Sequence, residues 1–498
     1  MGDILLEALS NILTLESFLS IFIGGALGII FGALPGLTAA MGVALLLPIT
    51  FGLEATTGIL FLLGVYCGGI YGGSITAVLI NTPGTPASAA TTLDGHPLAK
   101  KGKAGKALRM AIFASVFGGI FSALILIIAA PQLAKVALKF GPPEYLALAL
   151  FGLSVVSSVS GESKLKGLIM GGIGLLISTV GLDPVDASTR LMFGIEDLVS
   201  GIQLIPALIG LFAIAEIMNR SYVSHLKRQQ VGDSKNQSKL TWTDIKKSLK
   251  TIIKSSGIGT ILGAIPGAGP VTASFLSYNE AFRSSKNKAE FGKGSLEGVA
   301  AAESGNNGAT GATLIPLLTL GIPGDAVTAI LLGAFIMNDL EPGPLLFTDY
   351  GGIVYTIMIG LIVVNAFVFF QGQLAIRMFV KITKVPNNIL IPILLTLCIV
   401  GAYAVNNSMF DVRVMMIFGI IGFFLLKFGF PVTPLLLALI LGPIAENGMR
   451  QSLSMSGGDW SIFYTRPISF IFIVISVIAF FIPLVAQHIF NSKKDNKS

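Results

Sequence analysis

Gly28-Ile-Ile-Phe-Gly32-Ala-Leu-Pro35-Gly36 decides how this chain is organised, because its pattern returns in the second half as Gly259-Thr-Ile-Leu-Gly263-Ala-Ile-Pro266-Gly267. The two stretches align without gaps, and six of their nine positions are identical. A second Pro-Gly pair follows in each half, at Pro83-Gly84 and at Pro323-Gly324. An internal repeat of this kind predicts two equivalent structural units joined in one polypeptide.

The composition predicts an integral membrane protein. Of the 498 residues 53% are hydrophobic and 12% are charged, with a mean hydropathy of +0.82. A soluble globular domain carries about 25% charged residues, so a soluble fold could not bury this much apolar surface. The net charge of +7 comes from basic residues in short loops between apolar runs. This placement indicates the cytoplasmic side of a bilayer and argues against a nucleic-acid partner.

The charges around the Pro-Gly breaks indicate that the two halves face opposite ways. In the first half Glu54 lies between the breaks without a basic residue, and the basic stretch 100–109 follows the second break. In the second half the basic stretch 283–293 lies between the breaks, and the acidic stretch 339–349 follows the second one. By the positive-inside rule, this reversal predicts repeats of inverted topology.

These patterns predict an all-α polytopic membrane protein of about 12–14 membrane segments, with broken helices or re-entrant hairpins. We expect a first membrane repeat over 1–219 and a basic cytoplasmic connector over 220–254. A second, inverted repeat should cover 255–465, followed by a C-terminal helix and a basic cytoplasmic tail over 466–498. The connector boundaries depend on nine Lys or Arg residues set against two Asp residues in that segment.

Broken segments inside a membrane predict a binding site. A helix that ends in the hydrocarbon leaves backbone groups unpaired, so it persists only when buried in protein or beside a wet cavity. One Pro-Gly pair beside an apolar run is more often a surface loop, but four pairs in repeated positions favour a site near the bilayer midplane. Half-helix N-termini at such a site attract an anion.

Polar and Pro-Gly residues at the breaks are therefore our candidates for contacts. We predict that the substrate contacts Thr38, Asn81, Thr82, Thr85, Gly267 and Asn307. We predict that a coupling ion, Na⁺ or H⁺, contacts Pro35, Gly36, Gly84, Asn306, Gly321, Gly324 and Asp325. Asp325 could instead cap the following half-helix. Glu303 is costly to bury and so suggests function, although it could lie at a wet helix end.

Catalytic signatures are absent from the sequence. It contains no His-Glu-x-x-His, Walker lysine or nucleophile-elbow pattern, so we expect no enzyme activity and no cofactor. An intramembrane enzyme and a channel are the less favoured alternatives. Cys67 and Cys398 fall inside apolar runs and are expected to be packing residues.

Several long motifs resemble one transporter family. They are Gly32-Ala-Leu-Pro-Gly-Leu-Thr38, the stretch 71–87 around Asn81-Thr-Pro-Gly-Thr85, Leu93-Asp-Gly-His-Pro97, the stretch 297–307 ending in Asn306-Asn307, and the stretch 317–324. Over nearly the whole chain the sequence resembles the large permease subunit of the tripartite tricarboxylate transporters, the TctA family. One departure is Ala302-Glu303-Ser304, where the family often reads Pro-Glu-Ala.

The resemblance implies a function and partners. It implies ion-driven symport of a tricarboxylate such as citrate, or of a related carboxylate, into a bacterial cell across the inner membrane without ATP. A transporter of another small anion in the same superfamily is the alternative. The implied partners are a periplasmic or lipid-anchored substrate-binding protein, a small membrane subunit of about four helices and membrane lipid. It also implies a TRAP-like elevator architecture.

Overall fold

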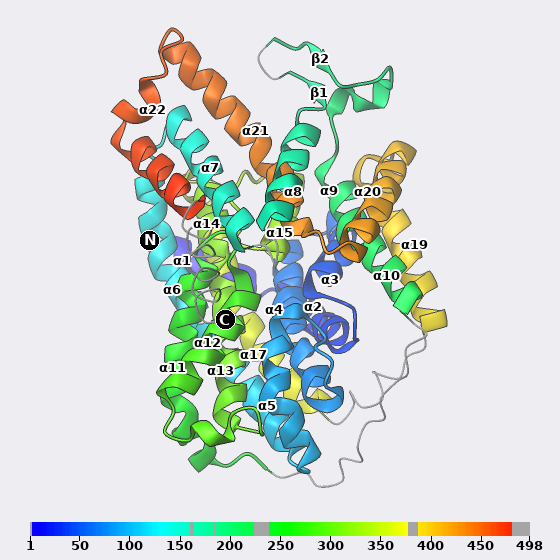
Figure 1. Cartoon of the computed structure of the whole chain (residues 1–498), viewed down its shortest axis with the longest axis vertical. Coiled ribbons are helices and arrows are strands. Elements are labelled where there is room, and N and C mark those ends of the chain that lie inside the picture. The colour runs from blue at the N-terminus through cyan, green and yellow to red at the C-terminus, as the bar shows by residue number, and fades with distance from the viewer. Residues whose placement is uncertain (1, 160–163, 184–185, 224–238, 377–386, 481–498) are drawn as a thin grey trace, which may run out of the picture.

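Most described residues of this chain lie in helices, as the computed structural model in Figure 1 shows. The structure describes residues 2–159, 164–183, 186–223, 239–376 and 387–480. Parts of the predicted connector and of the predicted tail, residues 224–238 and 481–498, therefore lie outside the described residues.

The elements of the first half run from α1 to α10. They are α1 (Gly2–Ile12), α2 (Leu15–Ala33), α3 (Ala39–Leu46), η1 (Leu47–Gly52), α4 (Ala55–Ile80), η2 (Pro86–Ser88), α5 (Ala89–Lys100), α6 (Ala104–Ala137), α7 (Pro142–Val159), α8 (Lys164–Ser178), β1 (Gly181–Leu182), β2 (Thr189–Arg190), η3 (Glu196–Ser200), α9 (Leu204–Leu208), η4 (Ile209–Ile214) and α10 (Ala215–Val223). The strands β1 and β2 pair antiparallel over two residues each.

The elements of the second half begin with α11. They are α11 (Trp242–Gly263), α12 (Gly269–Ser284), η5 (Lys288–Glu290), α13 (Leu296–Ala312), α14 (Leu314–Leu320), α15 (Ala326–Met337), α16 (Leu346–Asp349), α17 (Gly351–Ala375), α19 (Asn387–Asn406), α20 (Met409–Lys427), α21 (Val432–Met455) and α22 (Ile462–Thr465). A short apolar helix over Pro467–Phe480 follows them.

Seven described helices are long and apolar enough to cross a membrane. They are α2, α4, α6, α17, α19, α20 and α21. Shorter apolar helices lie over residues 39–52, 165–178, 204–219, 326–337 and 467–480. This agrees with the predicted all-α polytopic membrane protein.

Glycines allow α2 to pack directly on the backbone of α4. A Cβ atom at Gly28 would lie 2.4 Å from the carbonyl oxygen of Val65, and one at Gly32 would lie 2.1 Å from that of Gly69. No side chain fits there, so the two helices approach as small-residue faces do in membranes. Later residues of α2 face later residues of α4, so the two helices run parallel.

The second half repeats this packing between α11 and α13. A Cβ atom at Gly259 would lie 2.1 Å from the carbonyl oxygen of Gly305, and one at Gly263 would lie 2.6 Å from that of Ala309. These two helices are therefore also parallel to each other, and the same steric argument explains their glycines.

The two helix pairs run in opposite directions where they meet. Tyr66 in α4 contacts Thr313, with 3.3 Å between their hydroxyl oxygens. Further along the chain, Ala87 of η2 accepts a hydrogen bond from Asn306, which lies earlier in α13. Later residues of the first half thus contact earlier residues of the second half, so α4 and α13 are antiparallel.

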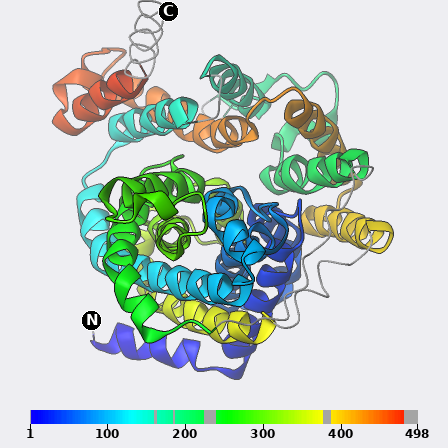
Figure 2. The same cartoon turned by 60° about the horizontal axis from the view of Figure 1, so that its bottom comes forward.

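The helices around α2, α4, α11 and α13 form what we call the central bundle, and a second group of helices lies beside it. In Figure 2, α7 and α21 pass along one edge of the bundle, with α8, α10 and α20 grouped nearby. α21 packs on both α7 and α8, and α20 packs on η4. Buried Leu148, Ala149 and Leu441 from this group contact Ile322 of the central bundle, so they cover the fourth Pro-Gly break.

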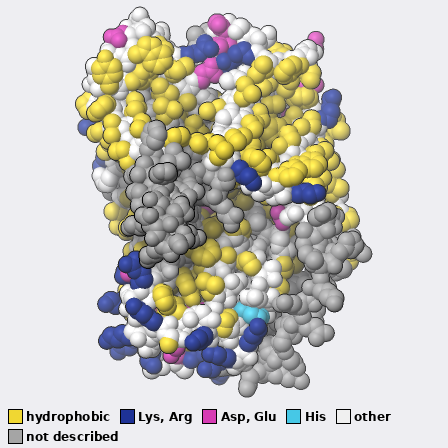
Figure 3. All heavy atoms as spheres, in the orientation of Figure 1, with side chains coloured by type: hydrophobic (Ala, Val, Ile, Leu, Met, Phe, Trp, Pro, Cys, Tyr) yellow, Lys and Arg dark blue, Asp and Glu magenta, His cyan; other side chains and the backbone are white. Residues whose placement is uncertain are grey.

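The molecule has one strongly basic end. Lys and Arg side chains gather at the bottom of Figure 3. There the ammonium group of Lys106 lies 2.8 Å from the Asp244 carboxylate. α11 begins at Trp242, inside the segment predicted as a connector, because Thr241 caps it and accepts a hydrogen bond from the N–H of Asp244. We call this end the basic end, and the opposite end, which carries β1 and β2, the arm end.

Candidate functional site

The first break of each half is a glycine turn of nearly identical geometry. Gly36 has φ +83° and Gly267 has φ +85°. This left-handed region strains residues that carry a Cβ atom, so glycine is required at both positions. Thr38 follows the first turn and caps α3, accepting a hydrogen bond from the N–H of Met41 at 3.1 Å. Pro35, Gly36, Thr38 and Gly267 are all half-buried.

The second breaks also share one local geometry. α4 ends at Asn81 with φ +54°, and α14 ends at Gly321 with φ +70°. After Pro-Gly, the N–H of Thr85 donates to the hydroxyl of Ser88 at 3.4 Å. At the matching place the N–H of Asp325 donates to the hydroxyl of Thr328 at 2.8 Å. Each break therefore stops one helix and caps the next.

The two breaks of each half lie against each other. A Cβ atom at Gly84 would lie 1.9 Å from the carbonyl oxygen of Gly32, one turn before the first break. In the second half, the N–H of Gly267 donates to the carbonyl oxygen of Gly324 at 2.8 Å. In the second half, a backbone group freed by one break is thus satisfied by the other, as non-helical backbone in a membrane requires.

Asp325 connects the fourth break to the first half. Its carboxylate accepts hydrogen bonds from the Thr328 N–H at 2.8 Å and from the Tyr66 hydroxyl at 2.8 Å. The side chain is 9% exposed and forms a capping box at the start of α15. The capping role considered for Asp325 from the sequence is therefore present. Ion coordination by Asp325 stays a prediction.

Glu303 lies in the interior of the central bundle. It is 0% exposed, which excludes the alternative that it sits at a wet helix end. Its two carboxylate oxygens accept hydrogen bonds from Thr91 at 2.5 Å and from Ser115 at 2.9 Å. Both hydroxyls come from the first half, so this acidic side chain of α13 joins α5 and α6 to the second half.

Asn306 and Asn307 are buried one helical turn beyond Glu303. The Asn306 amide donates to the carbonyl oxygen of Ala87 at 3.3 Å, and the Asn307 amide donates to the Asn306 side-chain oxygen at 2.6 Å. This chain of amides reaches η2, directly after the second break. Asn306 of α13 therefore lies near the segment that begins with the predicted residue Thr85, the N-cap of η2.

Other predicted residues stay apart. Asn81 and Thr82 are exposed, whereas Gly321 and Gly324 are buried. A cavity of about 730 Å³ lies toward the arm end, and Gly321 is the one predicted site residue that lines it. Its polar lining includes Ser178, Asn447 and Gln451. A single cavity surrounded by all four breaks stays a prediction.

Three hydroxyls near the breaks were missed as site residues. Tyr71, Ser74 and Ser274 have buried side-chain oxygens with no hydrogen-bond partner among the described residues. Buried hydroxyls normally find a partner, so these are available to a ligand or water. Their sequence signal was position: Ser74 lies nine residues before Pro83, and Ser274 lies eight after Pro266.

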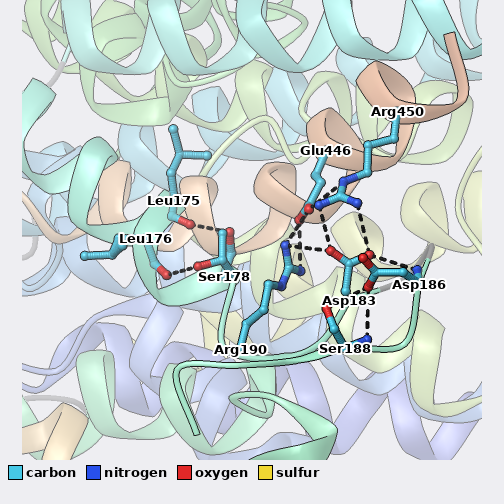
Figure 4. A network of polar contacts seen from close by, with 10 residues as sticks. Leu175, Leu176, Ser178, Asp183, Asp186, Ser188, Arg190, Glu446 and Arg450 are labelled. Atoms are coloured by element: carbon cyan, nitrogen blue, oxygen red, sulfur yellow. Dashed lines mark hydrogen bonds and ion pairs between the residues drawn. The ribbon is translucent and has the colours of Figure 1, made fainter. Parts of the chain in front are cut away.

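A network of charged side chains occupies the arm end, beside the cavity (Figure 4). The Arg190 guanidinium binds both Glu446 oxygens, at 2.6 and 3.2 Å. Arg450 lies 2.6 Å from Asp183 and 3.1 Å from Glu446. The hydrogen bond that Arg190 donates to Glu446 raises the pKa of Arg190. These bidentate pairs fasten β2 and the segment before it to α21.

The family model described as "Tripartite tricarboxylate transporter TctA family" matches residues 18–437. An Agrobacterium vitis protein, "Uncharacterized 52.8 kDa protein in TAR-I ttuC' 3'region", is 39% identical over 475 residues, covering 95% of this chain and 94% of the relative. A second Agrobacterium vitis protein, "Uncharacterized protein in TAR-II ttuC' 3'region", is 40% identical over 211 residues, covering 42% and 87%. No solved structure matches the chain.

Proposed function

This chain belongs to the tripartite tricarboxylate transporter TctA family, and from that membership we propose that it imports an organic carboxylate by ion-driven symport. The chain is a multi-pass membrane protein, and its family consists of large subunits of transporters that work with partner proteins. The finer steps of the proposal are the substrate, a tricarboxylate such as citrate or a related carboxylate, and the coupling ion, Na⁺ or H⁺.

The observation that carries the proposal is the paired breaks on helices that run in opposite directions. Gly36 and Gly267 have matching backbone angles, and so do the helix ends at Asn81 and Gly321. α4, which ends at Asn81, runs antiparallel to α13, which leads through Thr313 into α14. This agreement supports two inverted repeats, an arrangement in which transporters place their substrate and ion sites between the repeats.

The proposed substrate site uses neutral groups. Backbone N–H groups and the side chains of Thr38, Asn81, Thr82, Thr85 and Asn307, with Gly267, would hold the carboxylates. Half-helix N-termini attract negative charge without a fixed cation, so such a site can release an anion after translocation. The proposed ion site uses backbone at Pro35, Gly36, Gly84, Gly321 and Gly324 with the side chains of Asn306 and Asp325.

We further propose an elevator movement. The central bundle holds all four breaks, and the group containing α7, α8 and α21 contacts it mainly at the fourth break. A sliding of the bundle against this group would uncover Ile322 while covering Thr82. In this scheme the basic end faces the cytoplasm, by the positive-inside rule, and the protein lies in the bacterial inner membrane.

The proposed partners follow from the family. A periplasmic or lipid-anchored substrate-binding protein would deliver the carboxylate at the arm end. A small membrane subunit of about four helices would pack against the apolar surface within the membrane.

Uptake by intact cells tests the function. Cells that carry the chain with its partner proteins should accumulate radiolabelled citrate or another carboxylate, and an ionophore that collapses the ion gradient should stop accumulation. Replacing Asn306 by Ala should cut uptake at least about tenfold while folded protein in the membrane stays near the wild-type amount. Equal loss of uptake and folded protein would assign Asn306 a structural role instead.

A separate labelling experiment tests the orientation. Single cysteines at Lys101 and Lys286 should react with an impermeant reagent only from the cytoplasm, and those at Glu54 and Glu341 only from outside. Reaction of Lys101 and Glu341 positions from the same side would refute the inverted repeats.

A further inference from the structure

A short segment at the arm end extends beyond the helices that carry it. We call residues 181–183 and 186–203 the outer arm; they connect α8 to α9 and include β1, β2 and η3. Figure 1 shows β1 and β2 at the top of the molecule, above α8 and α9. The ion pairs of Arg190 with Glu446 and of Arg450 with Asp183 join β2 and Asp183 to α21. The outer arm is therefore a fixed projection.

Exposed apolar side chains follow β2. We call Leu191, Phe193 and Ile195 the tip of the outer arm. Phe193 is 82% exposed, and Leu191 and Ile195 are 42% and 45% exposed. Leu191 and Phe193 also have positive φ values of 51° each, a conformation that residues with a side chain adopt at a cost in free energy. Two large apolar side chains are thus exposed on backbone that is conformationally strained.

Acidic side chains surround this apolar tip. Asp186, Glu196 and Asp197 are all exposed. The one basic residue of the outer arm, Arg190, is already engaged by Glu446 and Asp183. Arg413 of α20 lies 3.9 Å from Asp197. Carboxylates beside the apolar residues disfavour burial in hydrocarbon and repel anionic lipid headgroups, so the surface is suited to a basic protein partner more than to a membrane.

The base of the outer arm also lines the route toward a break. Ser200, Gly201 and Ile202 form part of the wall of the 730 Å³ cavity, together with Gly321. A partner seated on the tip would therefore lie above the cavity that reaches the fourth break.

We propose that the outer arm is the docking surface for the substrate-binding protein of this transporter, with Phe193 as its apolar anchor. This inference rests on the proposed function. The exposed carboxylates of Asp186 and Glu196 favour a partner whose docking face carries basic residues. A single exposed aromatic ring entering a pocket can supply most of the affinity of such a contact. Docking there would place the substrate cleft of the binding protein near the cavity.

Uptake by cells that carry the complete transporter tests the docking surface. Phe193→Asp should lower the initial rate of labelled citrate uptake at least about tenfold, and reversing charge with Glu196→Lys and Asp197→Lys should lower it similarly. Trp460→Asp is the matched control, because Trp460 is a 60% exposed aromatic residue outside the outer arm. That control should keep uptake within about twofold of wild type. Folded protein is measured for each variant.

Photocrosslinking in the same cells gives an independent readout. With p-benzoyl-phenylalanine at position 193, the expected adduct is a soluble protein that binds citrate in isolation, and its yield should fall with the charge reversals. Adducts with lipid alone, or Phe193→Asp uptake near the wild-type rate, would overturn the proposal. If wild-type cells take up no carboxylate, the proposed function fails, whereas the crosslinked partner still decides where docking occurs.

Discussion

The breaks at 81–85 and 321–325 have the same local structure but opposite surroundings. In each, a helix ends at a residue with left-handed backbone, and Pro-Gly follows. The N–H of Thr85 or Asp325 then donates a hydrogen bond to the hydroxyl of the residue three positions later. Yet Asn81 and Thr82 are exposed, while Ile322 is 1% exposed under Leu148 and Leu441. Local geometry therefore follows the motif, and access to the break depends on whether α7 and α21 lie over it.

The comparison also separates two ways of stabilising a break. At the break over 81–85, Gly84 packs against backbone, and neutral hydroxyls cap the next segment. At the other, a buried carboxylate at Asp325 bonds the start of α15 and reaches Tyr66 across the repeat interface. The exposed break thus depends on close backbone packing, and the covered break depends on a polar cap.

The largest expected difference between the breaks is their accessibility. In a background without Cys67 and Cys398, a cysteine at Thr82 should react with a water-soluble thiol reagent at least about a hundredfold faster than one at Ile322, because the latter reacts only after local opening. Stopped-flow labelling measures both rates. Similar rates would show that the fourth break is also open to water.

Substitution of the break glycines should have the next largest effect. Gly84→Ala places a Cβ atom 1.9 Å from a backbone oxygen, which should cost about 3 kcal/mol or more and remove most folded protein. Gly324→Ala meets Thr313 at 2.8 Å and should cost less. Gly171→Ala is the control, since nothing lies within 4 Å. Folded yield is read by size-exclusion chromatography. Equal yields for Gly84→Ala and Gly171→Ala would contradict the packing described.

Removing the polar cap should have a moderate effect. Asp325→Ala leaves the Tyr66 hydroxyl and the Thr328 N–H without their acceptor, which should cost about 1–3 kcal/mol. Thr85→Ala at the exposed break should cost about 1 kcal/mol or less. Melting temperatures in detergent compare the two variants, with Tyr66→Phe as a control that removes one bond only. A larger loss for Thr85→Ala would reverse our assignment of the two mechanisms.

The smallest effect should come from the basic end, away from both breaks. Burial raises the pKa of Asp244, but hydrogen bonds from Lys106 and Thr241 outweigh it and hold the pKa at about 2. Because the folded pKa lies below the ordinary value of 3.8, this pair stabilises the fold above about pH 4 and loses that effect as the pH falls toward 2.

Asp244→Asn should therefore lower stability by less than about 1 kcal/mol at pH 7. The difference from wild type should shrink as the pH approaches 2. Melting temperatures of both proteins across this pH range measure it. A difference that grows on acidification would mean that Asp244 does not act through its charge.

Much of the backbone could be predicted from the sequence. Gly36, Gly267 and Gly321 take left-handed angles because glycine lacks a Cβ atom, and Pro35, Pro266 and Pro323 lie between consecutive helices. The connector over 220–254 stays a prediction; within it the Thr241 cap begins α11 at Trp242, a helix start that the basic residues of the segment did not indicate.

The sequence by itself determined where this chain breaks, which helices carry glycine faces and that it belongs in a membrane, since these depend on local sterics and on composition. Only the tertiary structure decided that Thr91 and Ser115 meet Glu303, that Tyr66 meets Asp325, and that α7 and α21 cover one break. Those contacts join residues about two hundred positions apart or more, and hydropathy and helical periodicity report only on neighbours along the chain.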